Sequence, residues 1–420
     1  MSTKSKIAFV GLTHLGLNHL AAAAKKGYNV LGLDIKKNYI DQLNDFQITY
    51  DEINLKETIK KYSKKISFSS NFKKLKKFKI IYICPDVKTN STGRSDTTYL
   101  KKLIGLTLKF VNKNSVIVIL SQVNPGFTRK IKFNHNKLYY QVETLVFGKS
   151  LQRALKPERI IIGCNKFDKK VDKVYLNFLK SYKCPIIKMK YESAELTKIS
   201  INILLASSIT TANTLANICT HLGADWYEIM PALRLDKRIG NNAYIKPGLG
   251  ISGGNIERDI YTIEKILKKY SNNSGIIKSI KDNSSEMRTW AYKVLKKEKI
   301  ISDKNKILGI LGLSYKENTN STKNSPSLDL LNKLKKNKII IYDPKAKLNV
   351  KSKNITQYNN LDKIIKISNV IILMTPWAEF SKVNNILKNN KKKIILIDPY
   401  RIINHSIASL STIKYFTIGK

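Results

Sequence analysis

The sequence has few cysteines, few acidic residues and no long uninterrupted apolar run. The four cysteines are far apart without CxxC spacing, which argues against a disulfide framework or zinc site: Cys84, Cys164, Cys184 and Cys219. The five histidines do not cluster, and we predict no metal site. No apolar run reaches the ~18–20 residues of a membrane-spanning helix, and the N-terminus lacks the apolar core of a signal peptide. We therefore predict a cytoplasmic protein without a membrane partner.

Acidic residues are far outnumbered by basic ones. The 76 Lys and Arg residues against 30 Asp and Glu give a formal net charge of +46. The basic residues are nearly all lysine and are spread over the whole length, a pattern typical of solvated surface charge. Because no DNA- or RNA-binding motif accompanies them, we predict no nucleic-acid partner. A basic surface would still help to attract a phosphorylated substrate.

The N-terminal segment has the pattern of a dinucleotide-binding βαβ unit. A strand at 6–11, a helix at 15–26 and a strand at 28–34 follow one another. Thr13 stands where the GxGxxG fingerprint has the glycine that lets the backbone meet a pyrophosphate, and Asp34 can bind ribose hydroxyls. A Rossmann-like fold without nucleotide is the alternative. We predict cofactor contacts by Gly11, Thr13, His14, Leu15, Gly16 and Asp34.

Further strands and one long helix follow. Ligand loops in parallel sheets lie at the carboxyl ends of strands, which places Cys84, Ser121, Gln122 and Glu143 around one crevice. Residues 193–222 form one helix that is too long for an ordinary crossover, so we expect it to join domains and to form a subunit interface.

The long helix presents polar side chains on an otherwise apolar pattern. Lys198 and Asn202 are four residues apart and share a face, with Glu195 one turn before them. This grouping favours a functional site. An exposed polar stripe is the alternative interpretation.

A glycine-rich loop, PGLGISGGNIERD at 247–259, leads into an amphipathic helix at 256–270. Glycines let backbone N–H groups approach a ligand, and a helix N-terminus adds partial positive charge, so we expect an anionic ligand or a reacting centre here. After a charged linker at 296–306, a second α/β unit begins at Ile307.

These patterns predict an α/β protein. We expect two Rossmann-like parallel-sheet domains joined by a long central helix and a helical connector. The expected regions are 1–192 for the N-terminal domain, 193–299 for the central helical region with the glycine-rich loop, and 300–420 for the C-terminal domain.

Taken together, the motifs resemble the UDP-glucose/GDP-mannose dehydrogenases along essentially the whole chain. The matching pieces, in the order of the family, include GLTHLG, SQVNPG, ETLVFG, AELTKISIN, DKRIG, KPGLGISGG and TPWAEF. The resemblance implies an NAD-dependent enzyme that oxidises the C6 alcohol of a nucleotide sugar to a carboxylate. It also implies an N-terminal NAD domain, a C-terminal nucleotide-sugar domain and a homodimer formed through the central helix.

Carried over position by position, the resemblance implies roles for individual residues. Glu143 and Asp259 would move protons, Lys198 would stabilise an alkoxide, and Asn202 would orient a water or oxyanion. Ser121 and Lys323 would contact the cofactor. Substrate contacts are implied for Glu143, Leu145, Lys198, Arg238, Tyr244, Gly248, Gly250, Gly253 and Lys316, with Arg238 reaching the substrate of the neighbouring subunit.

The departures from the family are concentrated at its site positions. Asn255 stands where the family has a cysteine that attacks the aldehyde, and an amide cannot take that role. Asparagine is among the best N-caps, so Asn255 is either a pure helix cap or a cap that also contacts substrate. Gln122 and Phe147 replace a threonine and a glutamate of the family pattern, and Ser321 and Lys323 replace an aspartate and an arginine.

Two functions remain open on this basis. The first is an NAD-dependent nucleotide-sugar oxidoreductase with altered chemistry, either one hydride transfer or an impaired four-electron oxidation. The alternative is a non-catalytic nucleotide-sugar-binding paralogue with a regulatory or partner role. The complete C-terminal domain argues against a related hydroxyacid dehydrogenase.

Overall fold

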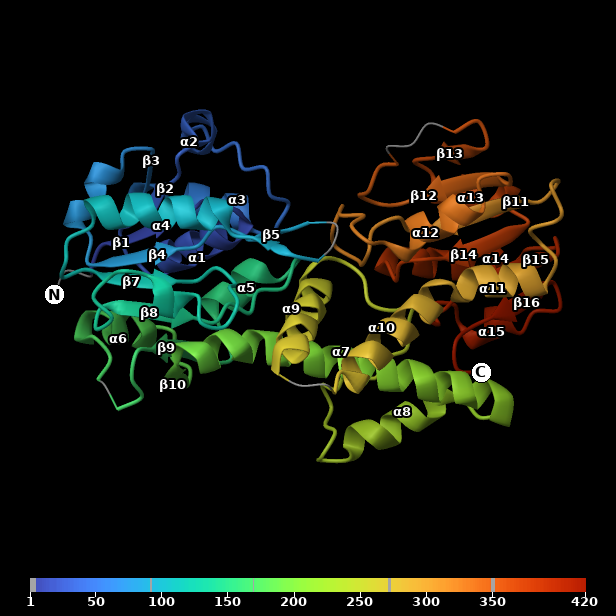
Figure 1. Cartoon of the computed structure of the whole chain (residues 1–420). Coiled ribbons are helices and arrows are strands. Elements are labelled where there is room, and N and C mark those ends of the chain that lie inside the picture. The colour runs from blue at the N-terminus through green and yellow to red at the C-terminus, as the bar shows by residue number, and fades with distance from the viewer. Residues whose placement is uncertain (1–4, 91–92, 169, 271–272, 349–351) are drawn as a thin grey trace. The chain divides into compact units, whose positions relative to one another are not determined.

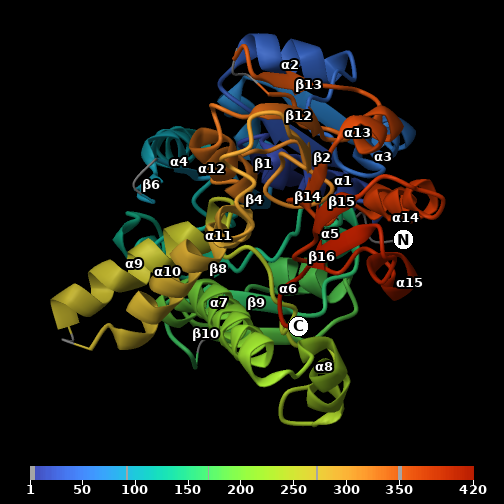
Figure 2. The ribbon, with the colours of Figure 1, turned by 90° about the vertical axis from the view of Figure 1, so that its right-hand side faces the viewer.

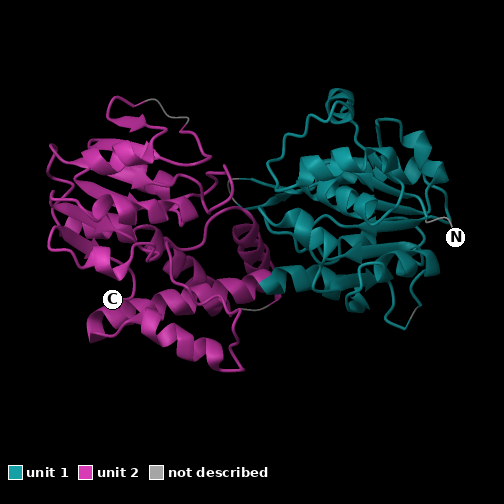
Figure 3. Ribbon diagram, turned by 180° about the vertical axis from the view of Figure 1, so that it is seen from behind, with its two compact units in different colours: residues 1–201 teal, residues 202–420 magenta. Residues whose placement is uncertain are grey.

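The computed structural model describes residues 5–90, 93–168, 170–270, 273–348 and 352–420. Contacts divide the chain into two compact units, residues 1–201 and 202–420, which Figure 3 shows in two colours. Residues 202–299 of the predicted central region belong to the second unit. The predicted central helix is α7, Tyr191–Leu222, which runs without a break from the first unit into the second.

The first unit is built on an eight-stranded sheet with the order β10-β9-β8-β7-β4-β1-β2-β3 (Figure 1). Its continuous apolar runs become strands whose residues are all buried, as expected where helices cover both faces. The sheet is not wholly parallel, because β8 and β9 pair in antiparallel orientation. The strands are β1 (Ile7–Val10), β2 (Val30–Leu33), β3 (Ile66–Ser69), β4 (Ile80–Ile83), β7 (Val116–Ile119), β8 (Leu138–Gln141), β9 (Ile160–Cys164) and β10 (Ile186–Lys190).

Helices connect these strands, and a short antiparallel pair, β5 (Lys88–Thr89) with β6 (Ser95–Asp96), extends from the unit. The first helix begins directly after the glycine turn at Gly11 and presents an almost wholly buried surface to the sheet. The helices of this unit before α7 are α1 (His14–Lys25), α2 (Lys37–Asn44), α3 (Leu55–Lys61), α4 (Thr98–Phe110), α5 (Ser150–Leu155) and α6 (Lys173–Lys180).

The second unit contains a six-stranded sheet with the order β13-β12-β11-β14-β15-β16, in which every neighbouring pair is parallel. This sheet is the second Rossmann-like domain that the alternation after Ile307 predicts. Its strands are β11 (Ile307–Leu311), β12 (Lys338–Tyr342), β13 (Ile355–Gln357), β14 (Val370–Leu373), β15 (Ile394–Ile397) and β16 (Ile413–Phe416).

A helical layer precedes that sheet. The helix that follows the glycine-rich loop, α9, lies beside α10 in both views of the ribbon (Figures 1 and 2). The core of the unit joins α7 and α8 side chains such as Ala216 and Trp226 to Leu308 and Ile310 of the sheet. The helices are α8 (Trp226–Leu235), α9 (Asn255–Tyr270), α10 (Gly275–Arg288), α11 (Trp290–Lys297), α12 (Pro326–Lys333), α13 (Leu361–Ile367), α14 (Lys382–Leu387) and α15 (His405–Ala408).

Helix α7 is more apolar than the sequence analysis expected. Within the described ranges it is the one helix whose length and composition would allow it to cross a membrane, and 33% of its most apolar window is buried. Its serines, threonines and asparagines interrupt the apolar run without adding charge, which explains why a search for uninterrupted runs passed over it.

Candidate active site

The turn after β1 has the geometry of a dinucleotide-binding turn. Gly11 has φ +91°, and a Cβ atom there would lie 2.7 Å from the Pro85 ring. A Cβ atom on Gly16 would lie 2.2 Å from the carbonyl oxygen of Gly11. Only glycine fits at either position, and the N–H groups at the start of α1 face the space that a pyrophosphate takes in such turns. The residues present therefore fit NAD.

Thr13 makes a contact that the missing glycine could not make. Its hydroxyl accepts the N–H of Asp86 at 2.7 Å and lies 3.5 Å from the carbonyl of Cys84. The Asp86 carboxylate in turn accepts the N–H of Leu15 at 3.3 Å. One backbone donor at the head of α1 is thus already bound to a negative charge. Sequence reasoning missed Asp86, although an acid just beyond the end of β4 is a usable signal.

Replacing Asp86 with asparagine is expected to tighten NAD binding about tenfold, or ~1.4 kcal/mol, because the change removes a negative charge from the place where the pyrophosphate binds. Calorimetric titration with NAD measures the effect. Asp96→Asn, at an exposed acid outside the turn, serves as the control and should leave the affinity unchanged. Equal or weaker NAD binding by Asp86→Asn would show that the Asp86 carboxylate does not oppose pyrophosphate binding at the head of α1.

Asp34 lies at the end of β2, where the sequence predicts a ribose-binding acid. It is only 2% exposed, and its carboxylate accepts the N–H of Leu12 at 3.0 Å and the hydroxyl of Tyr99 at 2.6 Å. The predicted contact of Asp34 with the cofactor ribose stays a prediction. Tyr99 comes from α4, which is distant in sequence, and sequence reasoning did not find it.

His14 is bound from two sides. Its Nε2 lies 2.9 Å from the buried carboxylate of Glu52, and its ring stacks on Phe147 with 4.3 Å between centroids. Glu52 also accepts the N–H groups of Gly148 and Ser150. Burial raises the pKa of Glu52, but the hydrogen bonds from His14, Ser150 and Gly148 outweigh it and hold that pKa below its usual value. Phe147, which replaces a glutamate of the family pattern, therefore packs directly against His14 of the predicted cofactor turn.

Two of the predicted catalytic residues lie together in the first unit. The Lys198 ammonium is 3.9 Å from the Glu143 carboxylate, and both side chains are about 85% buried. The N–H of Leu145 donates to the other Glu143 oxygen. Burial raises the pKa of Glu143, and the positive charge of Lys198 opposes that rise without cancelling it. A carboxyl group with a raised pKa beside an ammonium group is suited to accept and release a proton.

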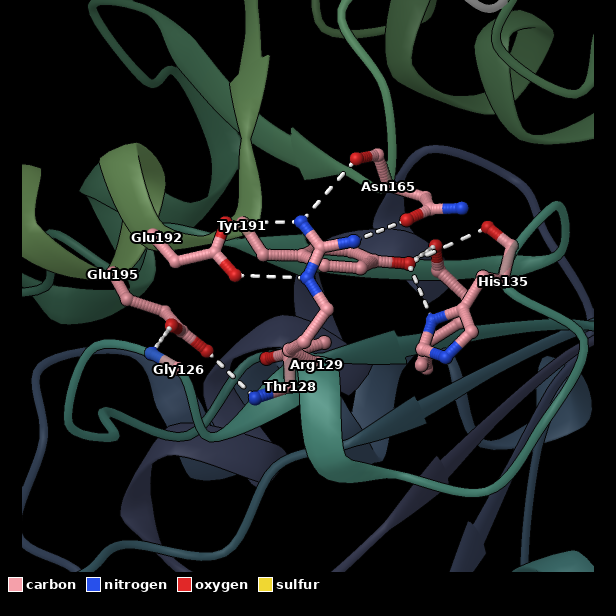
Figure 4. Close-up of polar contacts among 9 residues, drawn as sticks. Gly126, Thr128, Arg129, His135, Asn165, Tyr191, Glu192 and Glu195 are labelled. Carbon is pink, nitrogen blue, oxygen red and sulfur yellow. Dashed lines mark hydrogen bonds and ion pairs between the residues drawn. The ribbon is translucent and has the colours of Figure 1, made fainter.

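The loop that follows β7 is tied to the first turns of α7, as Figure 4 shows. The buried carboxylate of Glu195 accepts the N–H groups of Gly126 at 2.5 Å and Thr128 at 2.8 Å. The Arg129 guanidinium binds both oxygens of Glu192, at 2.8 and 3.0 Å. Glu195, which the sequence analysis grouped with Lys198, therefore positions this loop.

Ser121, at the start of the same loop, is fully buried. Its hydroxyl donates to the carbonyl of Pro85 at 2.6 Å, which links the loops that follow β7 and β4. Its implied contact with the cofactor stays a prediction.

In the second unit, Asn202 and Asp259 are in direct contact. The Asn202 amide donates to the Asp259 carboxylate at 2.5 Å, and Asp259 is only 1% exposed. The Arg258 guanidinium lies 3.6 Å from the other Asp259 oxygen. The amide and the guanidinium together stabilise a buried carboxylate, which would otherwise be costly in a low-dielectric interior.

The glycines of the predicted loop are required by close packing. Gly250 and Gly253 have positive φ values of +78° and +83°. A Cβ atom would lie 2.5 Å from the Ser284 carbonyl at the first and 2.7 Å from the Tyr315 ring at the second. The loop can therefore pass between α10 and the end of β11 only with glycine at these positions.

Asn255 is the first residue of α9 and is exposed. The carbonyl of Gly254 accepts the N–H of Arg258, so Gly254, not Asn255, holds the N-cap position. A Cβ atom on Gly254 would lie 3.1 Å from Nζ of Lys323, which places that predicted cofactor ligand beside the head of α9. The Asn255 side chain is thus not committed to capping.

No cysteine lies in the glycine-rich loop. Cys219 is the cysteine of the second unit, and it is buried in the core. In the first unit, burial raises the pKa of Cys84 well above its usual value and that of Cys164 to about 11, so neither thiol is a ready nucleophile. Among the described residues, no group of three or more His, Cys, Asp or Glu side chains is placed to hold a metal ion.

A pocket of about 620 Å³ opens beside the loop, a usual size for a small-molecule site. Tyr244, Gly248, Gly250 and Lys316 of the predicted substrate set line it. Arg238 does not line the pocket. It is exposed, and its guanidinium binds Asp236 two residues before it. Lining residues that the sequence analysis missed include Tyr227, Arg234, Asn241, Asn242, Tyr315, Glu317, Pro376 and Tyr400.

Three successive parts of the chain match the sequence models of three domains of one known protein family. Residues 5–179 match the NAD binding domain of the UDP-glucose/GDP-mannose dehydrogenase family, residues 192–285 its central domain and residues 309–405 its UDP binding domain. These ranges cover most of the chain and follow the order that the motifs predict.

Individual relatives agree with the family matches. The chain is 26% identical to a UDP-glucose 6-dehydrogenase from Rickettsia prowazekii (98% of this chain, 99% of the relative) and 26% identical to a UDP-N-acetyl-D-mannosamine dehydrogenase from Methanococcus maripaludis (96% and 94%). The fold is that of a UDP-glucose dehydrogenase from Pyrobaculum islandicum, with a TM-score of 0.85 at 22% identity over 100% of this chain and 98% of the other. The chain belongs to the UDP-glucose/GDP-mannose dehydrogenase family and is an NAD-dependent nucleotide-sugar dehydrogenase that acts on a CH–OH group.

Proposed function

We propose that this chain oxidises a UDP-linked sugar in one hydride transfer and releases a carbonyl product. The observation that carries the proposal is the head of α9, where an exposed asparagine follows the glycine cradle at the position that the resemblance assigns to a nucleophilic cysteine. An amide cannot form the covalent adduct through which an aldehyde is oxidised further. The polar groups that one alcohol oxidation needs, a proton acceptor and a positive charge near the oxygen, are present in Glu143 and Lys198.

The residues of the first unit suit the removal of a proton from an alcohol. When the carbon that bears the hydroxyl gives up its hydride, the hydroxyl must also lose a proton, and Glu143 can accept that proton. The buried ammonium of Lys198 stabilises the negative charge that develops on the oxygen. NAD supplies the hydride acceptor.

The residues of the second unit suit a nucleotide sugar. Lys316 lines the pocket and offers a positive charge to the phosphates, while Tyr315 and Tyr400 offer aromatic surface. The family model matched there is named for UDP binding, and both curated relatives named above act on UDP sugars by name. These points support UDP as the carrier. Asn202 and Asp259 form a preorganised pair at the base of the loop.

Incubation of the purified protein with a panel of UDP- and GDP-sugars and NAD tests the proposal. We expect NADH to form with a UDP-sugar, and mass spectrometry should find a product two hydrogen atoms lighter than the substrate. Absence of NADH with every sugar would overturn the proposed single hydride transfer. Thermal stabilisation by a nucleotide sugar without turnover would instead support the alternative of a binding paralogue, which the comparisons do not favour.

We further propose that the chain forms a homodimer through α7. Four apolar side chains of this helix share one exposed face, because their spacings of 11, 3 and 4 residues return to the same side of a helix: Leu204, Leu215, Ile218 and Leu222. Leu204 and Leu222 are 68% and 75% exposed in the single chain. The family resemblance implies that the same apolar face of a second copy of this chain covers it. The cytoplasmic location stays a prediction.

The double variant Leu204→Glu, Leu222→Glu is expected to be monomeric. Each leucine contributes ~1.5–3 kcal/mol when buried, so charging both should weaken association by at least ~10²-fold. Light scattering coupled to size exclusion measures the mass. Phe167→Glu, which replaces an apolar side chain that is 61% exposed in the first unit, is the control and should remain dimeric. A wild-type monomer, or a dimeric double variant, would rule out this interface.

A further inference from the structure

The second unit contains another cavity, of about 700 Å³, which the proposed function does not use. It is comparable in size to the pocket beside the glycine-rich loop, lined by Lys316, Tyr315 and Tyr400, which we call the nucleotide pocket. Residues from five elements surround it, namely the end of α7, the start of α8, helices α11 and α15, and the region of β16. A cavity formed by so many elements depends on the fold of the whole unit.

The lining combines aromatic rings with positive charge. Trp290, Tyr415 and Phe416 contribute rings, and Lys297 and Lys420 contribute ammonium groups. Aromatic surface with cationic groups at its edge suits a molecule that carries both a flat ring and an anionic group.

One wall is fixed by a half-buried ion pair. The Arg401 guanidinium lies 2.7 Å from the Asp225 carboxylate and 4.3 Å from the centre of the Tyr227 ring. Because Asp225 neutralises Arg401, the remaining side-chain charges on the lining are the ammonium groups of Lys297 and Lys420. The Nε–H of Arg401 is buried and has no hydrogen-bond partner among the described residues, which leaves one donor of the wall unused. A buried donor without a partner is costly unless a ligand or water satisfies it.

We propose that this cavity is a second binding site, and that its ligand is a small anionic molecule with an aromatic ring, up to the size of a mononucleotide. It is separate from the nucleotide pocket, since only Tyr227 lines both. Tyr400 faces the nucleotide pocket and its neighbour Arg401 faces the second one. A ligand in the second site therefore contacts Tyr227 and Arg401, which also form or adjoin the wall of the nucleotide pocket.

Calorimetric titration with 1-naphthyl phosphate tests the site. The probe carries a dianionic phosphate and a flat ring, and we expect one molecule to bind per chain. Lys297→Glu should weaken binding about tenfold or more, because it replaces an attractive charge with a repulsive one. Lys296→Glu makes the same charge change at the neighbouring exposed position of α11, outside the lining, and should bind within twofold of the wild type.

A third variant separates the two pockets. Lys316→Ala removes a cation from the nucleotide pocket and should leave binding of the probe within twofold of the wild type. Loss of binding in Lys316→Ala with retention in Lys297→Glu would place the probe in the nucleotide pocket and overturn the proposal. No binding by the wild type at millimolar probe, or equal effects of Lys296→Glu and Lys297→Glu, would overturn it as well. Unchanged thermal melting of each variant confirms that the fold is retained.

Discussion

Replacing Asn255 with cysteine is expected to turn a protein that releases a carbonyl product into one that makes the uronic acid. Position 255 is the first residue of α9, where backbone N–H groups lower the pKa of a thiol and favour the thiolate. The thiolate would attack the aldehyde to give a thiohemiacetal, which loses a second hydride and becomes a thioester that water hydrolyses. The yield should rise from one NADH for each sugar consumed to two. Mass spectrometry of the product and the NADH count measure the change.

Asn255→Ser is the matched control, since serine is small and polar but is a much weaker nucleophile than a thiolate in this place. It should keep the wild-type product. Uronic acid from the wild type at the rate of the cysteine variant would show that Asn255 does not limit the chemistry. A cysteine variant that stays at one NADH would mean that other site residues have also lost the second step.

Replacing Lys198 with methionine is expected to lower turnover by ~10²–10³, the usual cost of removing one group that stabilises a developing oxyanion. The same change should move the acidic limb of the pH–rate profile to higher pH. Burial raises the pKa of Glu143 above its usual 4.5, and Lys198 opposes the rise. Without the ammonium the pKa rises further, so a higher pH is needed to form the carboxylate that accepts the proton.

Initial rates of NADH formation between about pH 5 and 9 measure both effects. Lys190→Met is the control, because that lysine is exposed at the end of β10 in the same unit. It should keep the turnover and the profile of the wild type. A Lys198→Met variant whose rate falls without any shift of the limb would show that Lys198 does not set the pKa of Glu143.

The sequence predicted the buried strands and the glycine-rich loop well, because their signals are local. Short continuous apolar runs such as 80–83 and 116–119 favour buried strands, and the glycines at 250 and 253 mark backbone that other residues rarely adopt. The edge strand β3 was missed, because its residues Ile66–Ser69 are largely half-exposed and include two serines. Short edge strands carry little hydrophobic pattern.

Contacts between distant residues could not be predicted in the same way. Asp86 reaches the head of α1 across 71 residues, and Glu52 binds His14 and the start of α5 across intervals of 38 and 98 residues. The position of Asp86 just beyond β4 marks it as a candidate ligand residue, but neither acid's local sequence identifies the backbone or side chain that it binds. The predicted N-cap of α9 was wrong by one residue. Gly254 caps the helix instead of Asn255, so the Asn255 side chain is not used for capping. That one-residue difference matters because it exposes Asn255 at the head of the helix.

The most direct test of the central claim is the number of NADH molecules formed for each nucleotide sugar consumed by the wild-type protein, with the product identified by mass spectrometry. A single hydride transfer predicts a ratio of one and a carbonyl product, because the head of α9 offers an amide in place of a thiol. A ratio of two with a uronic acid product, or no NADH with any nucleotide sugar, would contradict it.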